Sequence, residues 1–365
     1  MSSDPPKWQA RIRQDVQGMH AYAIQDSAGL VKLDAMENPY SLPPELQDLL
    51  GQRLGRLALN RYPDARVNDL RAALAAYARM PEDYALILGN GSDELISLLA
   101  LACHMPGASV LAPVPGFVMY AMSAQLQGLA FHGVPLTADF ELDESAMLSA
   151  IEQHQPSLTY LAYPNNPTAN LWDEGVITRV IDAVGQQGGL VVVDEAYQPF
   201  AARSWLERMR AQPQAQGHVL LMRTLSKFGL AGVRLGYLMG PKALIAEIDK
   251  VRPPYNVSVL NYECALFALE HAQVFAQQAK EIKAQRAKIF QALTALPQVR
   301  AWNSEANMIL IRVPNAGQTF QGMKSRGVLI KNVSGLHPLL ANCLRLTVGT
   351  PEDNQVMLAA LKDSL

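Results

Sequence analysis

Short apolar runs alternate with amphipathic segments through the first two thirds of the chain. Apolar residues recur at helical spacing over 66–80, and a helix over 92–105 begins with Ser92 and Asp93 as capping residues. The strand-like runs around these helices are 84–91, 109–117, 157–168, 189–197, 218–227 and 234–240. Because the runs are separated by helices, the pattern predicts a mostly parallel sheet that helices cover on both faces.

The alternation ends near residues 252–254, and a different pattern follows. No glycine occurs between Pro241 and Ala316, and the segment 260–295 predicts one or two long helices. Strand-like runs at 307–313, 327–333 and 343–349 come next, with a last helix from about Glu352. The predicted fold class is α/β. It comprises a large domain over 41–255, a smaller α+β domain over 256–365, and an N-terminal arm over 1–40 that joins the smaller domain.

Polar residues follow the predicted strands of the large domain at their carboxyl ends. They are Gly91-Ser92-Asp93, Asn165-Asn166, Asp194 and Ser226-Lys227. In open sheets of parallel strands, ligands bind outside these ends. We therefore expect the four groups to meet around one ligand.

Composition and charge narrow the classes of function. The 365 residues include 31 Lys and Arg against 33 Asp and Glu, a net charge of −2, and 49% hydrophobic residues. This composition is typical of a folded globular protein, and the balanced charge predicts no nucleic-acid or membrane partner. The stretch Leu95–Ala138 lacks Asp, Glu, Lys and Arg, but prolines and glycines interrupt it, so we expect buried elements there rather than a membrane span.

Targeting signals and cysteines point in the same direction. The N-terminal residues show no signal-peptide pattern. The three cysteines, Cys103, Cys264 and Cys343, are too far apart for a CxxC pair and odd in number. The sequence therefore predicts a cytoplasmic protein without disulfides, and we expect no metal site.

Lys227 is the first candidate for chemistry. It follows an apolar strand and is flanked by small residues, where desolvation would lower the pKa of its amine and favour a Schiff-base nucleophile. An isolated lysine is more often a solvated loop residue. Arg234, with Thr224 and Ser226 nearby, makes the functional interpretation stronger, because these groups suit a phosphate.

Asp194 is the second candidate. Four apolar residues precede it, so its carboxylate emerges from a buried strand. Capping of a helix or an ion pair would explain such a residue, and so would pairing with a protonated pyridine nitrogen. Tyr197 lies close enough to reach the same ligand, although most tyrosines only pack. The glycine-rich junction 89–94 could bind phosphate at a helix N-terminus, but it lacks the spacing of GxGxxG or GxxxxGK.

Taken together and in order, the motifs resemble those of the fold-type-I aminotransferases that use pyridoxal 5′-phosphate (PLP), and most of all the histidinol-phosphate aminotransferases. The resemblance covers nearly the whole chain and includes the segments built around the candidate residues. The matching segments are ENPY (37–40), NRYPD (60–64), GNGSDE (89–94), PGFVMY (115–120), YPNNPT (163–168), VVVDEAY (191–197), RTLSKFGLAGVRLGY (223–237) and CLRLTVGTPEDN (343–354).

The resemblance implies a set of roles around PLP. Lys227 would hold PLP covalently and move protons, Asp194 would pair with the pyridine nitrogen, and Tyr197 would act beside them. The remaining implied contacts are Asn166 and Tyr197 on the phenolic oxygen, Phe117 stacked on the ring, and Gly91, Ser92, Asp93, Thr224, Ser226 and Arg234 around the phosphate. Tyr62 would reach the phosphate of a neighbouring subunit, which implies a homodimer. Arg345 would bind the anionic end of the substrate, with Tyr22, Asn166 and Lys331 beside it.

Three positions depart from the family pattern. Ala169 stands where the family usually has glycine, and Phe117 where many members have tyrosine. Lys331 replaces a second arginine found in some relatives, and lysine lacks the bidentate fork of arginine. The substrate role of Lys331 is therefore left open.

The resemblance implies transamination of L-histidinol phosphate with 2-oxoglutarate, giving imidazole acetol phosphate and L-glutamate in histidine biosynthesis. An aromatic or other amino-acid aminotransferase is the main alternative, and a threonine-phosphate decarboxylase-like enzyme is a more distant one. A non-catalytic binding protein of the same fold is disfavoured because Lys227, Asp194 and Arg234 are all present. A nicotinamide-dependent oxidoreductase is disfavoured because no GxGxxG follows a strand.

Overall fold

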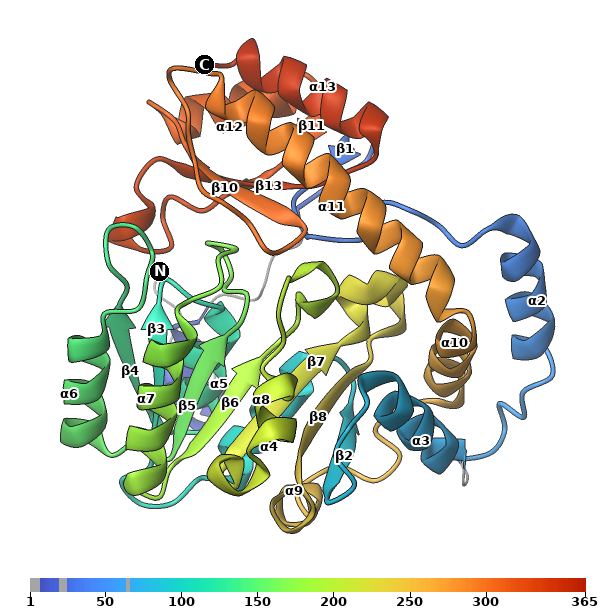
Figure 1. The fold of residues 1–365 in the computed structure, drawn as a ribbon, viewed down its shortest axis with the longest axis vertical. Coiled ribbons are helices and arrows are strands. Elements are labelled where there is room, and N and C mark those ends of the chain that lie inside the picture. The colour runs from blue at the N-terminus through green and yellow to red at the C-terminus, as the bar shows by residue number, and fades with distance from the viewer. Residues whose placement is uncertain (1–6, 20–24, 64–65) are drawn as a thin grey trace.

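Two sheets organise the protein, one in each half of Figure 1. The computed structural model describes residues 7–19, 25–63 and 66–365. The lower, seven-stranded sheet has the order β2-β8-β7-β6-β5-β3-β4, and the upper, four-stranded sheet has the order β12-β13-β10-β9. The strands of the large sheet are β2 (Tyr84–Gly89), β3 (Ser109–Val114), β4 (Ala130–Pro135), β5 (Leu158–Ala162), β6 (Leu190–Asp194), β7 (Val219–Thr224) and β8 (Gly236–Pro241).

The large sheet is mostly parallel, as the sequence predicts. Strands β4, β3, β5, β6 and β7 run parallel to one another, whereas β8 is antiparallel to both β7 and β2. Parallel strands need crossover connections, and the helices that make them lie on the two faces. The carboxyl ends of β5, β6 and β7 therefore meet at one edge of the sheet.

Helices cover both faces of the large sheet. In Figure 1, α6, α7 and α8 lie in front of it and α4 and α5 behind. Residues alternate along each strand between two cores: Val191 and Val193 of β6 face one, and Val192 faces the other. The helices over the large sheet are α3 (Arg66–Ala78), α4 (Ser92–Ala102), α5 (Val118–Leu126), α6 (Glu144–His154), α7 (Glu174–Gln186), α8 (Leu206–Ala211), α9 (Lys242–Asp249) and α10 (Val259–Glu270).

The smaller sheet has its own helices and core. The long helix α11 packs over it and descends toward α10, while α12 and α13 lie at the top of Figure 1. Its elements are α11 (Ala272–Thr294), β9 (Arg300–Ala301), β10 (Met308–Arg312), α12 (Ala316–Ser325), β11 (Val328–Leu329), β12 (Lys331–Asn332), β13 (Cys343–Thr347) and α13 (Pro351–Lys362). A capping box at Thr350 and Asp353 begins α13.

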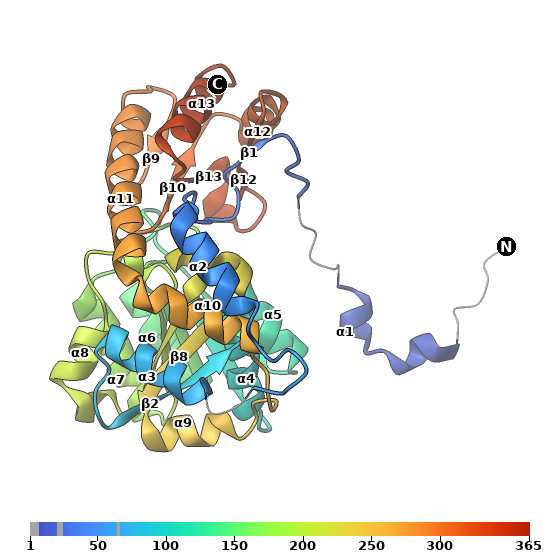
Figure 2. The ribbon, with the colours of Figure 1, turned by 90° about the vertical axis from the view of Figure 1, so that its right-hand side faces the viewer.

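The N-terminal residues contribute to the small part of the molecule. Strand β1 (Val31–Lys32) pairs in parallel with β11. Helix α1 (Gln14–Gln17) precedes β1 in the chain and α2 (Pro44–Leu54) follows it. Figure 2 shows α1 standing out to the side of the body. Arg13, just before α1, donates to the carbonyl oxygens of Gln125 and Leu126 at 3.0 and 2.6 Å.

The remaining elements are single turns. They are the 3₁₀ turns η1 (Lys7–Arg11), η2 (Gln198–Phe200), η3 (Pro213–Gln216), η5 (Ala231–Val233) and η6 (Pro338–Leu340), and the π-helical turn η4 (Ser226–Leu230). The predicted domain limits at residues 40 and 255 stay predictions. Tyr262 and Leu266 of α10 pack in the core of the large sheet, which favours a boundary after α10. No helix in the described ranges has the length and apolarity to cross a membrane.

The uncharged stretch 95–138 is buried only in part. Strand β3 and most of α4 lie in the interior, as expected. Strand β4, by contrast, forms an edge of the sheet with Ala130, Gly133 and Pro135 exposed, and Met105 lies on the surface. The expectation of burial was wrong there because an edge strand has a neighbour on one side only.

Candidate active site

A cavity of about 340 Å³ opens at the carboxyl ends of β5, β6 and β7. It brings together groups that are far apart in the sequence, including the segment 35–37 after β1 and the first residues of α4. Ten of the residues predicted from the sequence line it: Ser92, Asp93, Phe117, Asn166, Asp194, Tyr197, Thr224, Ser226, Lys227 and Arg234. The prediction that these strand ends share one ligand site is consistent with this arrangement.

Lys227 extends into the cavity from the turn η4, directly after β7. Its Nζ donates a hydrogen bond to the carbonyl oxygen of Ala35 at 2.9 Å and lies 6.0 Å from the ring centre of Tyr197. Burial, together with the positive charge of Arg345, lowers the pKa of the amine to about 8. A neutral amine is a nucleophile and a base, so the position suits chemistry rather than a solvated surface charge.

Asp194 ends strand β6 with its side chain buried. The Tyr120 hydroxyl donates to Oδ2 at 2.6 Å, and the backbone N–H of Ala196 donates to Oδ1 at 3.0 Å. Burial raises the pKa of this carboxyl to about 6, although both hydrogen bonds act to lower it. Within the described ranges no cation forms an ion pair with Asp194. A buried carboxylate without an opposite charge suits a cationic group on a ligand.

The N-terminus of α4 and the end of β7 form a cup for an anion. Gly91 has φ +82°, and a Cβ there would lie 2.6 Å from Nη2 of Arg234, so only glycine lets the guanidinium approach. Nη1 of Arg234 donates to the Ser226 hydroxyl at 3.3 Å, and the Thr224 hydroxyl donates to the same oxygen at 3.0 Å. Ser92 and Asp93, the first residues of α4, line the same end of the cavity, and the N–H groups at a helix N-terminus commonly bind phosphate.

Arg345 lies on β13 beside the cavity. It is buried, and its Nη1 donates to Oδ1 of Asn166 at 2.8 Å while Nη2 donates to the carbonyl oxygen of Asp34 at 2.8 Å. Because Arg345 occupies the amide oxygen of Asn166, the amide nitrogen is left to donate to a ligand. Lys331 is directly opposite Arg345 in the pairing of β12 with β13, but it does not line the cavity.

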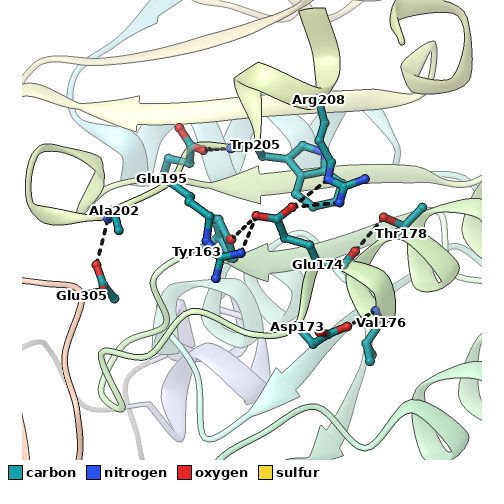
Figure 3. Close-up of polar contacts among 11 residues, drawn as sticks. Tyr163, Asp173, Glu174, Val176, Thr178, Glu195, Ala202, Trp205, Arg208 and Glu305 are labelled. Atoms are coloured by element: carbon teal, nitrogen blue, oxygen red, sulfur yellow. Dashed lines mark hydrogen bonds and ion pairs between the residues drawn. The ribbon is translucent and has the colours of Figure 1, made fainter. Parts of the chain in front are cut away.

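A layer of polar contacts behind the cavity anchors the strand ends. Glu195 is buried next to Asp194, binds Arg223 at 2.8 Å and accepts from the backbone N–H of Trp205 at 2.5 Å. Figure 3 shows the contact of Glu195 with Trp205. It also shows the carboxylate of Glu305, which accepts from the backbone N–H of Ala202 at 2.8 Å. These contacts tie β6 to β7 and to the loop that follows η2.

Some residues of the cavity escaped the sequence reasoning. Tyr120 lies three residues after Phe117, at the start of α5, and its ring packs edge-on against that of Phe117. Ala35, Met36 and Glu37 form one wall. Tyr120 and Glu37 stand within the recognised motifs PGFVMY and ENPY, so position in a motif was the only signal, and no chemistry was assigned to them.

Other predicted residues lie outside this cavity. Tyr62 is 77% exposed and lines a separate groove with Tyr255 and Arg234. Its contact with a neighbouring subunit stays a prediction. Tyr22 falls outside the described residues.

Comparison with known proteins identifies the family. The profile of the family "Aminotransferase class I and II" matches residues 28–361. The chain belongs to this family. It is 73% identical to histidinol-phosphate aminotransferase of Polaromonas naphthalenivorans, over 99% of this chain and 98% of that one. It is 70% identical to the same enzyme of an Acidovorax species, over 98% and 97%.

A solved structure agrees with the fold of this class I and II aminotransferase. Histidinol-phosphate aminotransferase from Sinorhizobium meliloti in complex with pyridoxal-5′-phosphate superimposes with a TM-score of 0.82, at 22% identity, over 96% of each chain. This likeness, with the family match, confirms the predicted fold class of a large, mostly parallel sheet with helices and a smaller α+β part. The high identity to the two relatives places the chain among the histidinol-phosphate aminotransferases.

Proposed function

We propose that the chain transfers the amino group of L-histidinol phosphate to 2-oxoglutarate with PLP as cofactor, in histidine biosynthesis. The observation that carries this proposal is the cavity that joins the Lys227 amine, the buried Asp194 carboxylate and the anion cup around Arg234. These three groups match the aldehyde, the pyridine nitrogen and the phosphate of PLP. The substrate is inferred from relatives at 70–73% identity over almost the full length.

The residues of the cavity suit PLP on structural grounds. Asp194 is a buried carboxylate that lacks an ion pair in the described part of the chain, and a protonated pyridine nitrogen would supply the opposite charge. The cup closes only because Gly91 has no Cβ. Phe117 would stack on the ring, with Asn166 and Tyr197 on its phenolic oxygen. When bound, PLP supplies an electron sink for negative charge that develops on the substrate carbon.

Lys227 would move the proton in each half-reaction. Burial lowers the pKa of the Lys227 amine to about 8 in the cofactor-free protein, which favours the neutral form that accepts a proton at Nζ. Such general acid–base catalysis contributes about 10²–10⁴-fold in rate. Ala35 accepts a hydrogen bond from Nζ and so keeps the amine at the cavity rather than in solvent.

Arg345 would bind the anionic end of both substrates. Its planar guanidinium suits a phosphate ester in one half-reaction and a carboxylate in the other. Asn166 and Asp34 hold the guanidinium plane at two nitrogens. Tyr22 and Lys331 stay predicted partners of the substrate.

The choice of amino donor tests the proposal. We expect kcat/KM for L-histidinol phosphate to exceed that for L-phenylalanine by at least about a hundredfold, because a site built for polar groups rejects a ligand without them. Both donors are assayed with 2-oxoglutarate, with threonine phosphate assayed for release of carbon dioxide. A preference for phenylalanine, or decarboxylation of threonine phosphate, would contradict the proposed substrate.

A pair of variants tests whether the cavity is the active site. Lys227→Ala should abolish transamination and the visible absorbance band of bound PLP, because the amine that holds the cofactor is gone. Lys242→Ala, at the start of α9 and outside the cavity, is the matched control and should retain both. A Lys227→Ala protein with an unaltered band and rate would rule out the enzyme mechanism.

A further inference from the structure

Glu37 is a carboxylate of the cavity for which the proposed reaction has no role. Within the described ranges the carboxylates that line the cavity are Glu37, Asp93 and Asp194. Asp194 is placed to pair with the PLP nitrogen, and Asp93 lies 3.5 Å from Arg234 at the phosphate end. Glu37 lines the cavity from the segment after β1, next to Ala35 and Met36.

The backbone before Glu37 is held in an unusual conformation. Met36 is buried with φ +52°, in the left-handed region that side chains other than glycine rarely adopt. Its N–H donates to the Thr347 hydroxyl at 3.1 Å, and its carbonyl oxygen accepts from Nδ2 of Asn307 at 2.9 Å. Strained backbone of this kind persists where surrounding groups fix it, and it concentrates at functional sites. The turn therefore fixes the place of Glu37 at the cavity.

The segment that ends in Glu37 passes both groups that would bind the substrate. The carbonyl oxygen of Asp34 accepts from Arg345, and that of Ala35 accepts from Lys227. A substrate with its anion on Arg345 and its amine beside Lys227 thus lies along this segment. The side chain of the substrate, which is its third group, would then lie beside Glu37 in the same wall of the cavity.

The present partner of Glu37 is exchangeable. Its carboxylate forms an ion pair with Lys32, which also lies 3.3 Å from Asp34. The side chains of Lys32 and Glu37 are 33% and 46% exposed. Ion pairs exposed to this degree contribute little stability, so a donor on a ligand can replace the ammonium group at small cost. Lys32 keeps Asp34 as a partner when it releases Glu37.

We infer that Glu37 accepts a hydrogen bond from the imidazole N–H of the amino donor and thereby selects it over donors with an apolar ring. The inference rests on the proposed function, whose substrate carries the imidazole. An imidazole always presents at least one N–H donor, and a carboxylate accepts only. A phenyl ring offers no donor, so Glu37 would keep its ion pair with Lys32 and the ring would gain no hydrogen bond from it.

Binding of two unreactive ligands to the PLP-loaded protein tests the inference. The probes are 3-(imidazol-4-yl)propyl phosphate, which is histidinol phosphate without its amino group, and 3-phenylpropyl phosphate, titrated by calorimetry. The unmodified protein should bind the imidazole compound at least about tenfold more tightly. Glu37→Met should weaken that compound about tenfold and the phenyl compound less than twofold. Glu37→Gln, which keeps an acceptor oxygen, should fall between the two.

A matched variant serves as the control, and two results would overturn the inference. Glu45→Gln removes an exposed carboxylate of α2 that does not line the cavity, and it should leave both affinities unchanged. Equal weakening of both probes by Glu37→Met would indicate a structural role and overturn the inference, as would unchanged affinities. Failure of the proposed function appears separately, as an unmodified protein that does not transaminate histidinol phosphate.

Discussion

Burial of the Asp194 carboxylate costs stability in the cofactor-free protein, but the same carboxylate would pair with the pyridine nitrogen of bound PLP. Its carboxyl pKa is raised from 3.8 to about 6 by burial, and two hydrogen bonds offset only part of that cost. Ionisation of the Asp194 carboxyl group therefore costs free energy in the cofactor-free protein, and a bound cation would offset that cost. Functional sites commonly keep such groups at the expense of stability.

The variant Asp194→Asn should stabilise the protein that lacks cofactor. A carboxyl whose pKa is raised on folding contributes stability below pH 4, and this contribution is lost as the pH rises through 6. The neutral amide avoids that loss, and its oxygen still accepts from the Tyr120 hydroxyl, but its NH2 group cannot accept from the backbone N–H of Ala196. Because the lost hydrogen bond offsets part of the gain of about 3 kcal/mol, we expect the free energy of unfolding at pH 8 to rise by about 1–2 kcal/mol, with the gain shrinking as the pH falls. Urea titrations at pH 5, 6.5 and 8 measure it.

The same variant should bind PLP much more weakly, because the pyridine nitrogen loses its counter-charge. Asp182→Asn, an exposed change on α7, is the control and should alter neither stability nor PLP affinity. A cofactor-free Asp194→Asn protein that is less stable than the parent at pH 8 would contradict the argument from burial.

At the scale of elements, the sequence predicts most clearly the helices and strands whose apolar residues follow one regular pattern. The buried runs that became β5, β6 and β7, and the helices α3 and α4, were expected near their observed bounds. Strand β4 was not predicted, because its exposed edge breaks the apolar run with Gly133 and Pro135. The antiparallel direction of β8 also has no local signal, since a buried strand reads the same in both directions.

The turn after β5 offers a test at the same scale. Ala169 is fully buried with φ +63°, packs in the core of the small sheet, and its carbonyl oxygen accepts from the N–H of Glu305 at 2.7 Å. Ala169→Gly relieves about 1–2 kcal/mol of backbone strain but loses a buried methyl group and gains freedom when unfolded. We expect a net change in the free energy of unfolding within about 1 kcal/mol.

Ala169→Val should behave differently in the same urea titration. A branched side chain is strained in the left-handed region and overpacks a filled space, so we expect a loss of about 3 kcal/mol. A valine variant as stable as the glycine variant would show that neither side-chain packing nor the positive φ at this position determines the stability of the protein.

At the scale of the whole molecule, motifs predicted the cavity better than residue chemistry alone. Lys227, Asp194 and Arg234 could be singled out because charged groups follow apolar strands. Glu37 and Tyr120 could not, because only the folded chain brings them to the cavity. The contact of Tyr120 with Asp194, which is 74 residues away in the sequence, is an example. Long-range contacts of this kind have no local signature in a single sequence.

The predicted homodimer gives a test of how the sites are built. Tyr62 and Tyr255 stack at 4.5 Å on an exposed face, in a groove that also contains Arg234. If Tyr62 serves the phosphate of a neighbouring subunit, Tyr62→Glu should inactivate by repelling that phosphate, and Lys227→Ala inactivates through the lost amine. Mixed after partial unfolding and refolding, the two variants would then form heterodimers in which one site has both intact residues.

We therefore expect recovery of activity in about one quarter of all sites when equal amounts are mixed. Each variant refolded alone is the control and should stay inactive. If Tyr62 acted within its own chain, every site with an intact Lys227 would carry the altered Tyr62, and mixing would restore nothing. The assay thus distinguishes a site shared between two chains from a site complete in one, because only the shared arrangement lets two defective chains complement each other.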